Sequence, residues 1–195
     1  MNLKVNEIFY SLQGEGGRQG EASIFIRLSG CNLKCDFCDT SHEEGVFMTE
    51  QEILDSISKY PCRWIVWTGG EPSLQLNDDI LRYFHDKGYF QAVESNGHYP
   101  LSDLFDYKVV SPKGKNIDYA RLKNANVEEV RLPVNKGDII PEISSLPKAK
   151  HYFLSPVFLS EETRTQGNIA YCVSYIMQNT NWHLSLQIHK LIGIE

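Results

Sequence analysis

The sequence predicts an α/β protein in which about six parallel strands, with helices outside them, form a partial barrel of the (β/α)6 type with trimmed helices. Strand-like and helix-like segments alternate along the chain, and several predicted strands run into loops with chemically unusual residues. Barrel enzymes place their sites at the carboxyl ends of the strands in this way. The chain has 195 residues, whereas a complete eight-fold barrel typically needs about 250. A flavodoxin-like sheet is the alternative fold.

The first half of the chain carries four clear secondary-structure signals. Residues Ala22–Leu28 are rich in β-formers and predict a strand. A helix is expected over Thr49–Lys59, because this segment opens with the Thr-Glu-Gln-Glu pattern of a capping box. The apolar run Arg63–Trp67 predicts the next strand. Residues Asp78–Lys87 have apolar side chains at helical spacing and end before Gly88, a residue suited to a helix C-terminus.

The second half of the chain continues the alternation. The further predicted strands are Tyr89–Glu94, Tyr107–Val110, Val127–Leu132, His151–Leu154 and Trp182–Ile188. A helix is predicted over Thr165–Gln178. No repeat, low-complexity tract or linker interrupts the series, so we expect a single domain that covers residues 1–195.

The bulk composition is typical of a globular protein that binds neither nucleic acid nor membrane. The chain is 42% hydrophobic and has a formal net charge of −6, whereas duplex DNA and anionic membranes select for basic surfaces. No apolar run approaches the roughly 20 residues of a membrane span. The first residues lack the apolar stretch of a signal peptide. We therefore expect a cytoplasmic protein.

The five cysteines fall into two groups. An odd number in a chain without an export signal disfavours a disulfide framework. Cys62 begins an apolar strand and Cys172 lies in a predicted helix, so both are interpreted as packing residues. The remaining three cysteines lie close together and need a different explanation.

Cys31, Cys35 and Cys38 form a C-x₃-C-x₂-C motif in a polar loop after the first predicted strand. Three thiolates at this spacing can hold three corners of a cubane iron–sulfur cluster, whereas electron-transfer clusters usually have four Cys ligands. The fourth iron is then free to bind a small molecule. The alternative is a zinc site, for which His42 or Cys62 would have to supply a fourth ligand.

The segment Thr68–Pro72, Thr-Gly-Gly-Glu-Pro, follows the next predicted strand. Two glycines let the backbone pass close to a ligand, because no Cβ stands in the way. Together with the three-cysteine motif, this segment resembles the radical S-adenosylmethionine (SAM) enzymes. The resemblance implies that the open iron chelates the amino and carboxylate groups of SAM, and that the reduced cluster cleaves SAM to a 5′-deoxyadenosyl radical.

Further motifs narrow the resemblance to one family. They are Leu12–Gly16, Arg27, Cys38–Thr40, Glu94–Gly97, Ser111–Lys113 and the C-terminal segment Leu184–Ile194. From Asn6 to the C-terminus the chain is similar to the 7-carboxy-7-deazaguanine synthase family of queuosine and 7-deazapurine biosynthesis. The resemblance implies conversion of 6-carboxy-5,6,7,8-tetrahydropterin to 7-carboxy-7-deazaguanine with loss of ammonia. It also implies a [4Fe–4S] cluster, SAM and Mg²⁺ as cofactors, and hydrogen abstraction from C6 followed by ring contraction.

The resemblance also implies roles for individual residues. The cluster ligands are Cys31, Cys35 and Cys38. The residues expected at SAM are Phe37, Gly70, Ser111, Pro112, Lys113, Ser155, Pro156, Val157 and Phe158. The residues expected at the substrate are Leu12, Gln13, Gly14, Arg27 and Thr68, and Thr40 is expected at Mg²⁺. No side chain is assigned as a catalytic acid or base, and Glu15, Glu94 and His189 are given no defined role.

This chain departs from the family pattern in two places. Phe37 stands where relatives often have Trp, and Ser155–Phe158 stands where relatives often have Gln-Pro. The expected partners are the small pterin substrate, a second copy of the chain in a homodimer, and an electron donor such as flavodoxin or ferredoxin. The alternative functions are an activase that places a glycyl radical on a partner protein and a zinc-binding interaction module.

Overall fold

The computed structural model describes residues 2–36, 38, 43–113 and 126–194. Its centre is one nine-stranded sheet with the order β3-β1-β2-β4-β5-β6-β7-β8-β9. The strands are β1 (Asn2–Leu12), β2 (Ala22–Leu28), β3 (Val46–Thr49), β4 (Trp64–Gly69), β5 (Phe90–Ser95), β6 (Tyr107–Val110), β7 (Asn126–Val134), β8 (Lys148–Pro156) and β9 (His183–Leu184). The strands from β2 onward, β3 excepted, pair in parallel, and β1 pairs antiparallel with β2 and β3.

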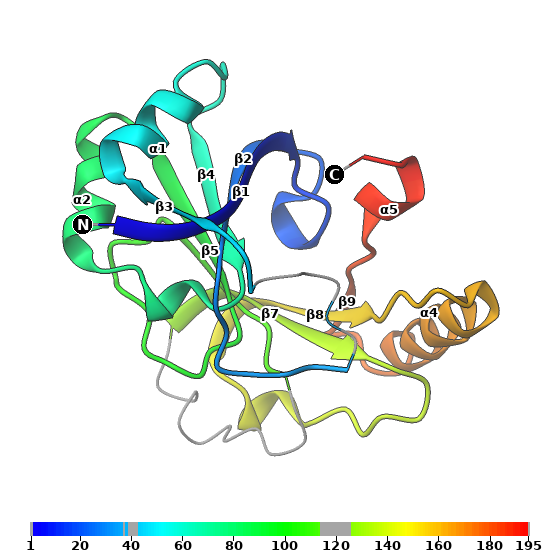
Figure 1. Cartoon of the computed structure of the whole chain (residues 1–195). Coiled ribbons are helices and arrows are strands. Elements are labelled where there is room, and N and C mark those ends of the chain that lie inside the picture. Colours follow the sequence, from blue (N-terminus) through cyan, green and yellow to red (C-terminus); the bar gives the residue numbers. More distant parts are fainter. Residues whose placement is uncertain (1, 37, 39–42, 114–125, 195) are drawn as a thin grey trace.

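The six long parallel strands follow one another across the sheet in chain order. A flavodoxin-like sheet would instead reverse its strand order at a switch point, so that alternative is wrong. Within the described residues the sheet stays open, with β3 and β9 at its edges. The sheet curves around the loop between β1 and β2 (Figure 1). This is the expected partial barrel.

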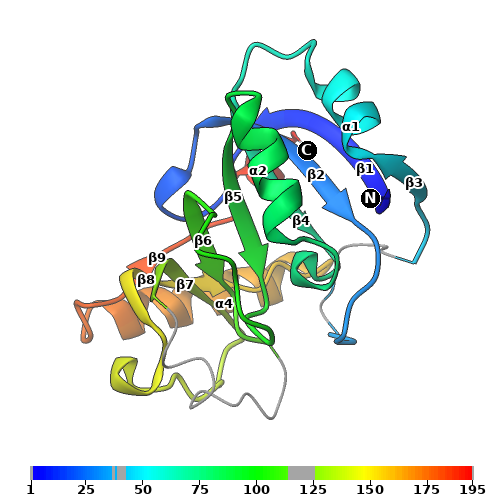
Figure 2. The same cartoon turned by 90° about the vertical axis from the view of Figure 1, so that its left-hand side faces the viewer.

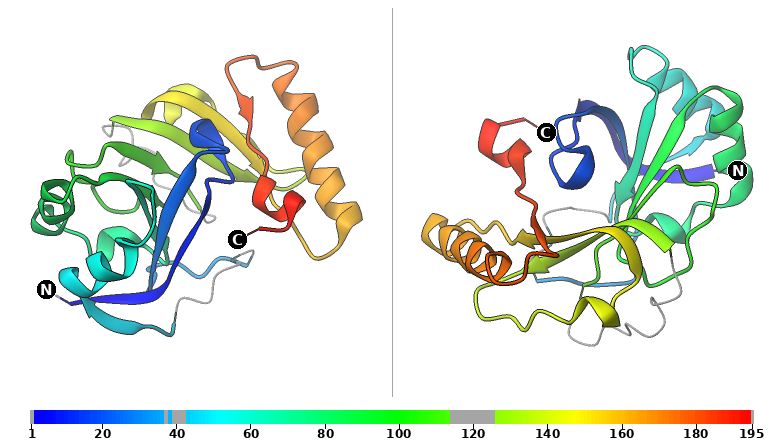
Figure 3. Two further views of the ribbon diagram at one scale, coloured as in Figure 1. Left: turned by 90° about the horizontal axis from the view of Figure 1, so that it is seen from above. Right: turned by 180° about the vertical axis from the view of Figure 1, so that it is seen from behind.

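The helices α1 (Glu50–Ile57), α2 (Asp78–Asp86) and α4 (Glu162–Ile176) cover the outside of the curved sheet. The short C-terminal helix α5 (Ile188–Ile192) is not part of this outer layer. Figure 2 shows α1 and α2 on the outer face near β2, β4 and β5. In both views of Figure 3, α4 lies beside the opposite end of the sheet and α5 lies near the β1–β2 loop. Single 3₁₀ turns occur at Gly16–Arg18, Pro72–Leu74 and Ile143–Ser145.

Two apolar clusters form the core. The first packs α1 and α2 onto β1, β2, β4 and β5, and its fully buried members include Ile24, Ile53, Trp67 and Phe84. The second packs α4 onto β6, β7 and β8 and includes Val130, Leu154, Cys172 and Trp182. Cys172 is fully buried, and Cys62 is partly buried against the first cluster. Both therefore pack as expected.

The predicted helix ends agree with the capping contacts of the structure. The Thr49 hydroxyl accepts a hydrogen bond from the Glu52 amide at 3.3 Å, and the Thr49 amide donates to the Glu52 carboxylate at 2.7 Å, which completes the capping box. After α2, Gly88 has a φ of +80° and its amide donates to the His85 carbonyl at 2.8 Å. A residue with a Cβ would be strained at this φ.

Three parts of the sheet differ from the sequence-based expectation. Strands β1 and β3 were not predicted. The predicted strand Trp182–Ile188 is wrong beyond His183–Leu184, because the chain leaves the sheet at Ser185. The Ser185 amide still donates to the Leu154 carbonyl at 3.0 Å, and the Ile188 amide then donates to the Gly14 carbonyl at 3.1 Å. Backbone bonds to the β1–β2 loop thus replace the sheet ladder.

None of the helices in the described part of the chain is both long and apolar enough to cross a bilayer.

Candidate functional site

A cavity of about 530 Å³ lies at the carboxyl ends of the parallel strands. It brings together fifteen of the residues that the sequence singled out: Leu12, Gln13, Gly14, Arg27, Cys31, Cys35, Cys38, Thr68, Gly70, Ser111, Lys113, Ser155, Pro156, Val157 and Phe158. Pro112 is buried beside the cavity and is not part of its lining. Phe37 and Thr40 lie outside the described residues. Residues at the ends of the five strands β1, β2, β4, β6 and β8, and residues of the loops that follow β1 and β2, therefore meet at one place.

The three-cysteine loop follows β2 and borders this cavity with all three thiols. A local turn, in which the Cys38 amide donates to the Cys35 carbonyl at 3.1 Å, brings two of the cysteines together. Burial raises the pKa of the Cys35 thiol, and the Lys113 ammonium opposes that shift. Among the described residues, no three His, Cys, Asp or Glu side chains are grouped closely enough to hold one metal ion. A donor set of three thiols around one cavity fits an iron–sulfur cluster with one iron left open.

The Gly-Gly-Glu segment after β4 packs directly against the backbone at the start of the cysteine loop. The Gly70 amide donates to the Leu28 carbonyl at 2.9 Å, and the Glu71 amide donates to the Gly30 carbonyl at 2.8 Å. A Cβ on Gly70 would lie 1.8 Å from the Gly30 oxygen. Glycine is therefore required here for contact between two segments of the chain, in addition to any approach to a ligand.

Glu71 was not predicted as a site residue, yet its carboxylate organises this region. The side chain is fully buried. Its Oε1 accepts hydrogen bonds from the Ser73 amide and hydroxyl at 3.1 and 2.6 Å and from the Ser95 hydroxyl at 2.8 Å, and its Oε2 accepts from the Asn96 amide at 2.8 Å. The carboxylate thus ties the end of β4 to the end of β5.

Asn96 continues this connection to the cysteine loop. Its Oδ1 accepts from the His98 amide at 2.9 Å, so its Nδ2 must be the atom that faces Asn32. That nitrogen donates to Asn32 Oδ1 at 2.9 Å. Asn32 directly follows Cys31 in the chain. The first cysteine, Glu71 and the end of β5 therefore belong to one hydrogen-bonded unit.

Arg27 and Thr68 lie side by side on the adjacent strands β2 and β4, where they are register partners. The Arg27 Nε donates to Glu7 Oε1 at 2.5 Å, and the guanidinium lies 5.5 Å from the ring of Phe9. Phe9 stacks on Phe25 with ring centroids 4.9 Å apart. This wall of the cavity is thus a cation and a hydroxyl beside two aromatic rings, all of which border the same space.

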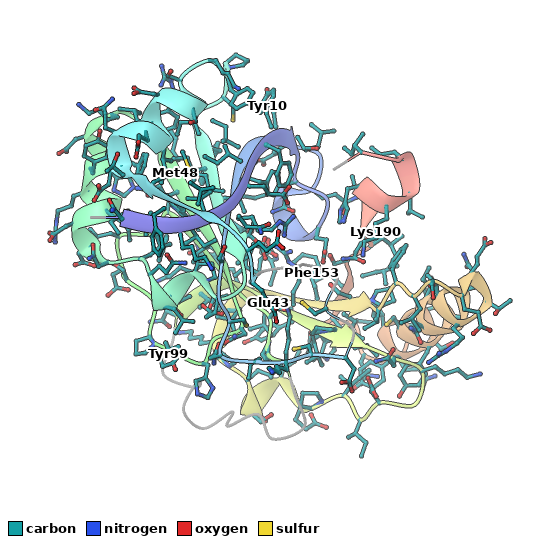
Figure 4. All side chains as sticks on the ribbon, viewed as in Figure 1. Tyr10, Glu43, Met48, Tyr99, Phe153 and Lys190 are labelled. Carbon is teal, nitrogen blue, oxygen red and sulfur yellow. The ribbon has the colours of Figure 1, made fainter. Side chains whose placement is uncertain are left out.

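The β1–β2 loop forms the opposite wall with the C-terminal segment. The Ile188 amide donates to the Gly14 carbonyl, and a Cβ on Gly14 would lie 1.9 Å from His189 Nδ1. Gln187 Nε2 donates to Glu15 Oε1 at 2.9 Å. His189 and Lys190 also border the cavity, and Figure 4 shows Lys190 on α5. Gln187, near the end of the predicted strand, and the residues that follow it therefore form part of the cavity wall.

A buried ionic cluster centred on β7 contains two further residues that sequence reasoning missed, Arg131 and Glu129. Arg131 donates to Glu94 Oε1 and Glu129 Oε2, both at 2.9 Å, and its Nη1 lies 3.8 Å from Glu15. Burial raises the pKa of Glu94, and the charge of Arg131 opposes that shift. A signal existed: Glu129 and Arg131 are two positions apart in the predicted strand Val127–Leu132, so these opposite charges share one face of the strand.

Comparison with known proteins gives concordant results. Residues 25–139, more than half of the chain, match the family model of the radical SAM superfamily. The chain is 43% identical over 194 residues to the 7-carboxy-7-deazaguanine synthase of Bacteroides thetaiotaomicron, with both chains covered in full. It is 34% identical over 201 residues to the 7-carboxy-7-deazaguanine synthase of Haemophilus influenzae. The aligned region covers all of this chain and 95% of that protein.

A solved structure agrees in fold. The crystal structure of QueE from Escherichia coli superposes with a TM-score of 0.73 at 22% identity and covers 96% of this chain and 94% of that one. At this identity the likeness concerns the arrangement of the strands and helices.

Proposed function

This chain belongs to the radical SAM superfamily and, within it, to the 7-carboxy-7-deazaguanine synthases, and on that premise we propose how its cavity is used. The proposed reaction converts 6-carboxy-5,6,7,8-tetrahydropterin to 7-carboxy-7-deazaguanine with loss of ammonia. One observation carries the proposal: the three thiols, Gly70, Arg27 and the Gln13–Gly14 loop, which come from distant parts of the sequence, border one cavity.

The cofactor side of the cavity is proposed to be the side of the cysteine loop. Cys31, Cys35 and Cys38 would bind the [4Fe–4S] cluster. When bound, the cluster would supply the one-electron reduction of SAM from which hydrogen abstraction at C6 of the pterin would start. The SAM residues would be Gly70, the Ser111–Lys113 segment and the Ser155–Phe158 segment, and Phe37 would lie by the adenine.

The substrate side is proposed to be the wall formed by β1, β2 and β4. The planar guanidinium of Arg27 suits a carboxylate group, so Arg27 would exchange its pairing with Glu7 for the carboxylate of the pterin. Leu12, Gln13, Gly14 and Thr68 would hold the ring, which positions the reacting carbon.

A magnesium ion is proposed next to the substrate. Mg²⁺ is a hard cation that keeps few protein ligands and relies on substrate oxygens and water. Thr40 would supply its hydroxyl oxygen, and the ion would orient the substrate for ring contraction. No side chain is proposed as an acid or base.

The remaining proposals concern the protein as a whole. Residues 1–195 would form a single domain, two copies would form a homodimer, and a flavodoxin or ferredoxin would reduce the cluster in the cytoplasm. The support for these proposals is the family to which the chain belongs.

An anaerobic turnover assay tests the function. Reconstituted protein is mixed with SAM, reductant, Mg²⁺ and 6-carboxytetrahydropterin, and the products are identified by mass spectrometry. We expect 7-carboxy-7-deazaguanine from the wild type, no SAM cleavage from Cys31→Ala, and retained activity from the control Cys62→Ala. Formation of 5′-deoxyadenosine alone would favour the glycyl-radical activase, and SAM cleavage by Cys31→Ala would refute the cluster assignment.

A further inference from the structure

Arg131 on β7 is the centre of a buried group of charges on the cavity wall. Its guanidinium contacts three carboxylates, those of Glu15, Glu94 and Glu129, which come from the β1–β2 loop, β5 and β7. The Arg131 side chain is 6% exposed and that of Glu129 is fully buried, whereas Glu15 and Glu94 are 18% and 19% exposed and border the cavity. One positive charge therefore serves three acids, two of which a ligand can reach.

The contacts of these acids fix the β1–β2 loop. Gln13 Nε2 donates to Glu94 Oε1 at 3.0 Å, so the Gln13 Oε1 faces the other way and accepts from the Glu15 amide at 3.1 Å. On the far side, Glu129 Oε1 accepts from the Gly17 amide at 2.7 Å. The loop is thus attached to Arg131 through Glu94 at one end and through Glu129 at the other.

The burial of Glu94 and its acidic neighbours make the positive charge of Arg131 necessary for the ionisation of Glu94. Burial disfavours the charged form of Glu94, and the neighbouring Glu129 and Glu15 act in the same direction, so only Arg131 favours ionisation among these groups. The Tyr107 hydroxyl donates to Glu129, and burial together with this bond raises the pKa of Tyr107, so the hydroxyl stays neutral and adds no further negative charge. The other titratable groups on the cavity wall are Glu7, Arg27, Cys31, Cys35, Cys38, Lys113, His189 and Lys190.

We infer that Arg131 is a positioning residue of the reaction: it is the counterion of Glu94 and Glu15 on the cavity wall, and it holds the loop of Gln13 and Gly14. The ligand chemistry that such a wall selects is a flat group rich in N–H donors. This inference rests on the proposed function, because it takes Gln13 and Gly14 to contact the substrate.

Arginine is required for geometric reasons. Its planar fork offers separate N–H groups to Glu129, Glu94 and Glu15, whereas a lysine ammonium is a single point on a flexible stem. Removal of the only cation from a buried group of acids leaves uncompensated charge, and the acids respond by taking up protons. The carboxylate acceptors of the wall would then become O–H donors.

The chain contains a matched control, because a second buried arginine anchors the same loop without contacting these acids. Arg18 is 5% exposed, its guanidinium lies 3.7 Å from the ring centroid of Trp64, and its Nε donates to Glu21 at 2.9 Å. It does not border the cavity. Arg18→Met therefore disturbs the loop without changing the charge on the cavity wall.

The experiment compares wild type, Arg131→Met, Arg131→Lys and Arg18→Met as cluster-reconstituted proteins. The first readout is the infrared C=O band of protonated carboxyl groups, followed from about pH 6 to about pH 9. The second is the dissociation constant for 6-carboxytetrahydropterin at the same pH values. Arg131→Lys keeps the charge, so it remains informative where Arg131→Met does not fold.

In Arg131→Met we expect the protonated-carboxyl band to persist to higher pH than in wild type. Pterin binding at about pH 7 should weaken tenfold or more, as expected for loss of charge-assisted hydrogen bonds. The difference in dissociation constant between Arg131→Met and wild type should become smaller as the pH rises. In Arg131→Lys the band should follow wild type and binding should be intermediate. In Arg18→Met any weakening should be the same at every pH.

Two results would overturn the inference: an unchanged infrared band in Arg131→Met, or a loss of binding in Arg131→Met that is as independent of pH as that in Arg18→Met. A wild-type protein that binds no pterin would refute the proposed function, while the infrared comparison would still decide whether Arg131 keeps Glu94 charged.

Discussion

Glu71→Gln isolates the contribution of one buried carboxylate to the unit that carries the cysteine loop. The change preserves shape but replaces one acceptor oxygen by an NH₂ donor. Glu71 Oε1 has three donors and Oε2 has one. The amide oxygen of Gln will therefore take the place of Oε1, and the new NH₂ will face the Asn96 amide, which is a second donor.

The expected loss of stability follows from the two donors, the new NH₂ group and the Asn96 amide, that would face each other. A buried donor without an acceptor costs about 1–3 kcal/mol, and the bonds that remain lose their charge assistance, which roughly halves their strength. We expect a loss of about 3 kcal/mol in the free energy of unfolding. For a chain of this size, that corresponds to a fall in Tm of about 6–12 °C. Glu71→Leu removes all four acceptor contacts and should cost more.

The assay is denaturant unfolding of the cluster-free protein under anaerobic conditions, followed by circular dichroism and tryptophan fluorescence. Glu142→Gln is the matched control, since Glu142 is exposed, and surface changes of this kind stay within about 0.5 kcal/mol. Iron incorporation is the second readout, because Asn96 also holds Asn32 beside Cys31. Stability of Glu71→Gln equal to that of the control, or a smaller loss in Glu71→Leu than in Glu71→Gln, would refute the reasoning.

Three further predictions address other parts of the molecule. Gly70→Ala should lower both iron content and thermal stability, because its Cβ would lie 1.8 Å from the Gly30 oxygen; wild-type iron loading would contradict this. Burial raises the pKa of Cys172 to about 12. Native protein treated with iodoacetamide at about pH 8 should therefore be alkylated at the half-buried Cys62 before Cys172. The reverse order, detected by mass spectrometry, would contradict the packing. Thr40→Val should weaken the Mg²⁺ dependence of turnover, and an unchanged Mg²⁺ titration would remove Thr40 from the proposed metal site.

Much of the fold could be predicted from the sequence because its signals are local. The capping box at Thr49 and the C-terminal glycine after α2 act within one helical turn, and both appear in the structure as expected. The alternation of strands and helices, with the short length, indicated a partial barrel, and the strand order agrees. The elements missed are those that depend on the rest of the sheet: the edge strand β3 and strand β1, both of which form by antiparallel pairing.

The end of the chain shows why a local pattern can mislead. The alternation in Trp182–Ile188 predicts a strand, but only His183–Leu184 pairs with β8. From Ser185 onward, the chain bonds to the β1–β2 loop: the Gly16 amide donates to the Ser185 hydroxyl at 3.0 Å, and the Ile188 amide donates to the Gly14 carbonyl at 3.1 Å. A competing partner far away in sequence decides the outcome, and no window of the sequence contains it.

The same division between local and long-range information applies to the candidate site. The sequence by itself determined the thiol set, the Gly-Gly-Glu segment and the loop around Gln13, because each is a short run whose spacing carries its chemistry. Only the tertiary structure decided that Glu71 joins the cysteine loop to β5 and that Arg131 serves three acids from three separate elements. A buried charge must have a partner of opposite charge. The order and register of the strands decide which charged residues lie close enough to be that partner.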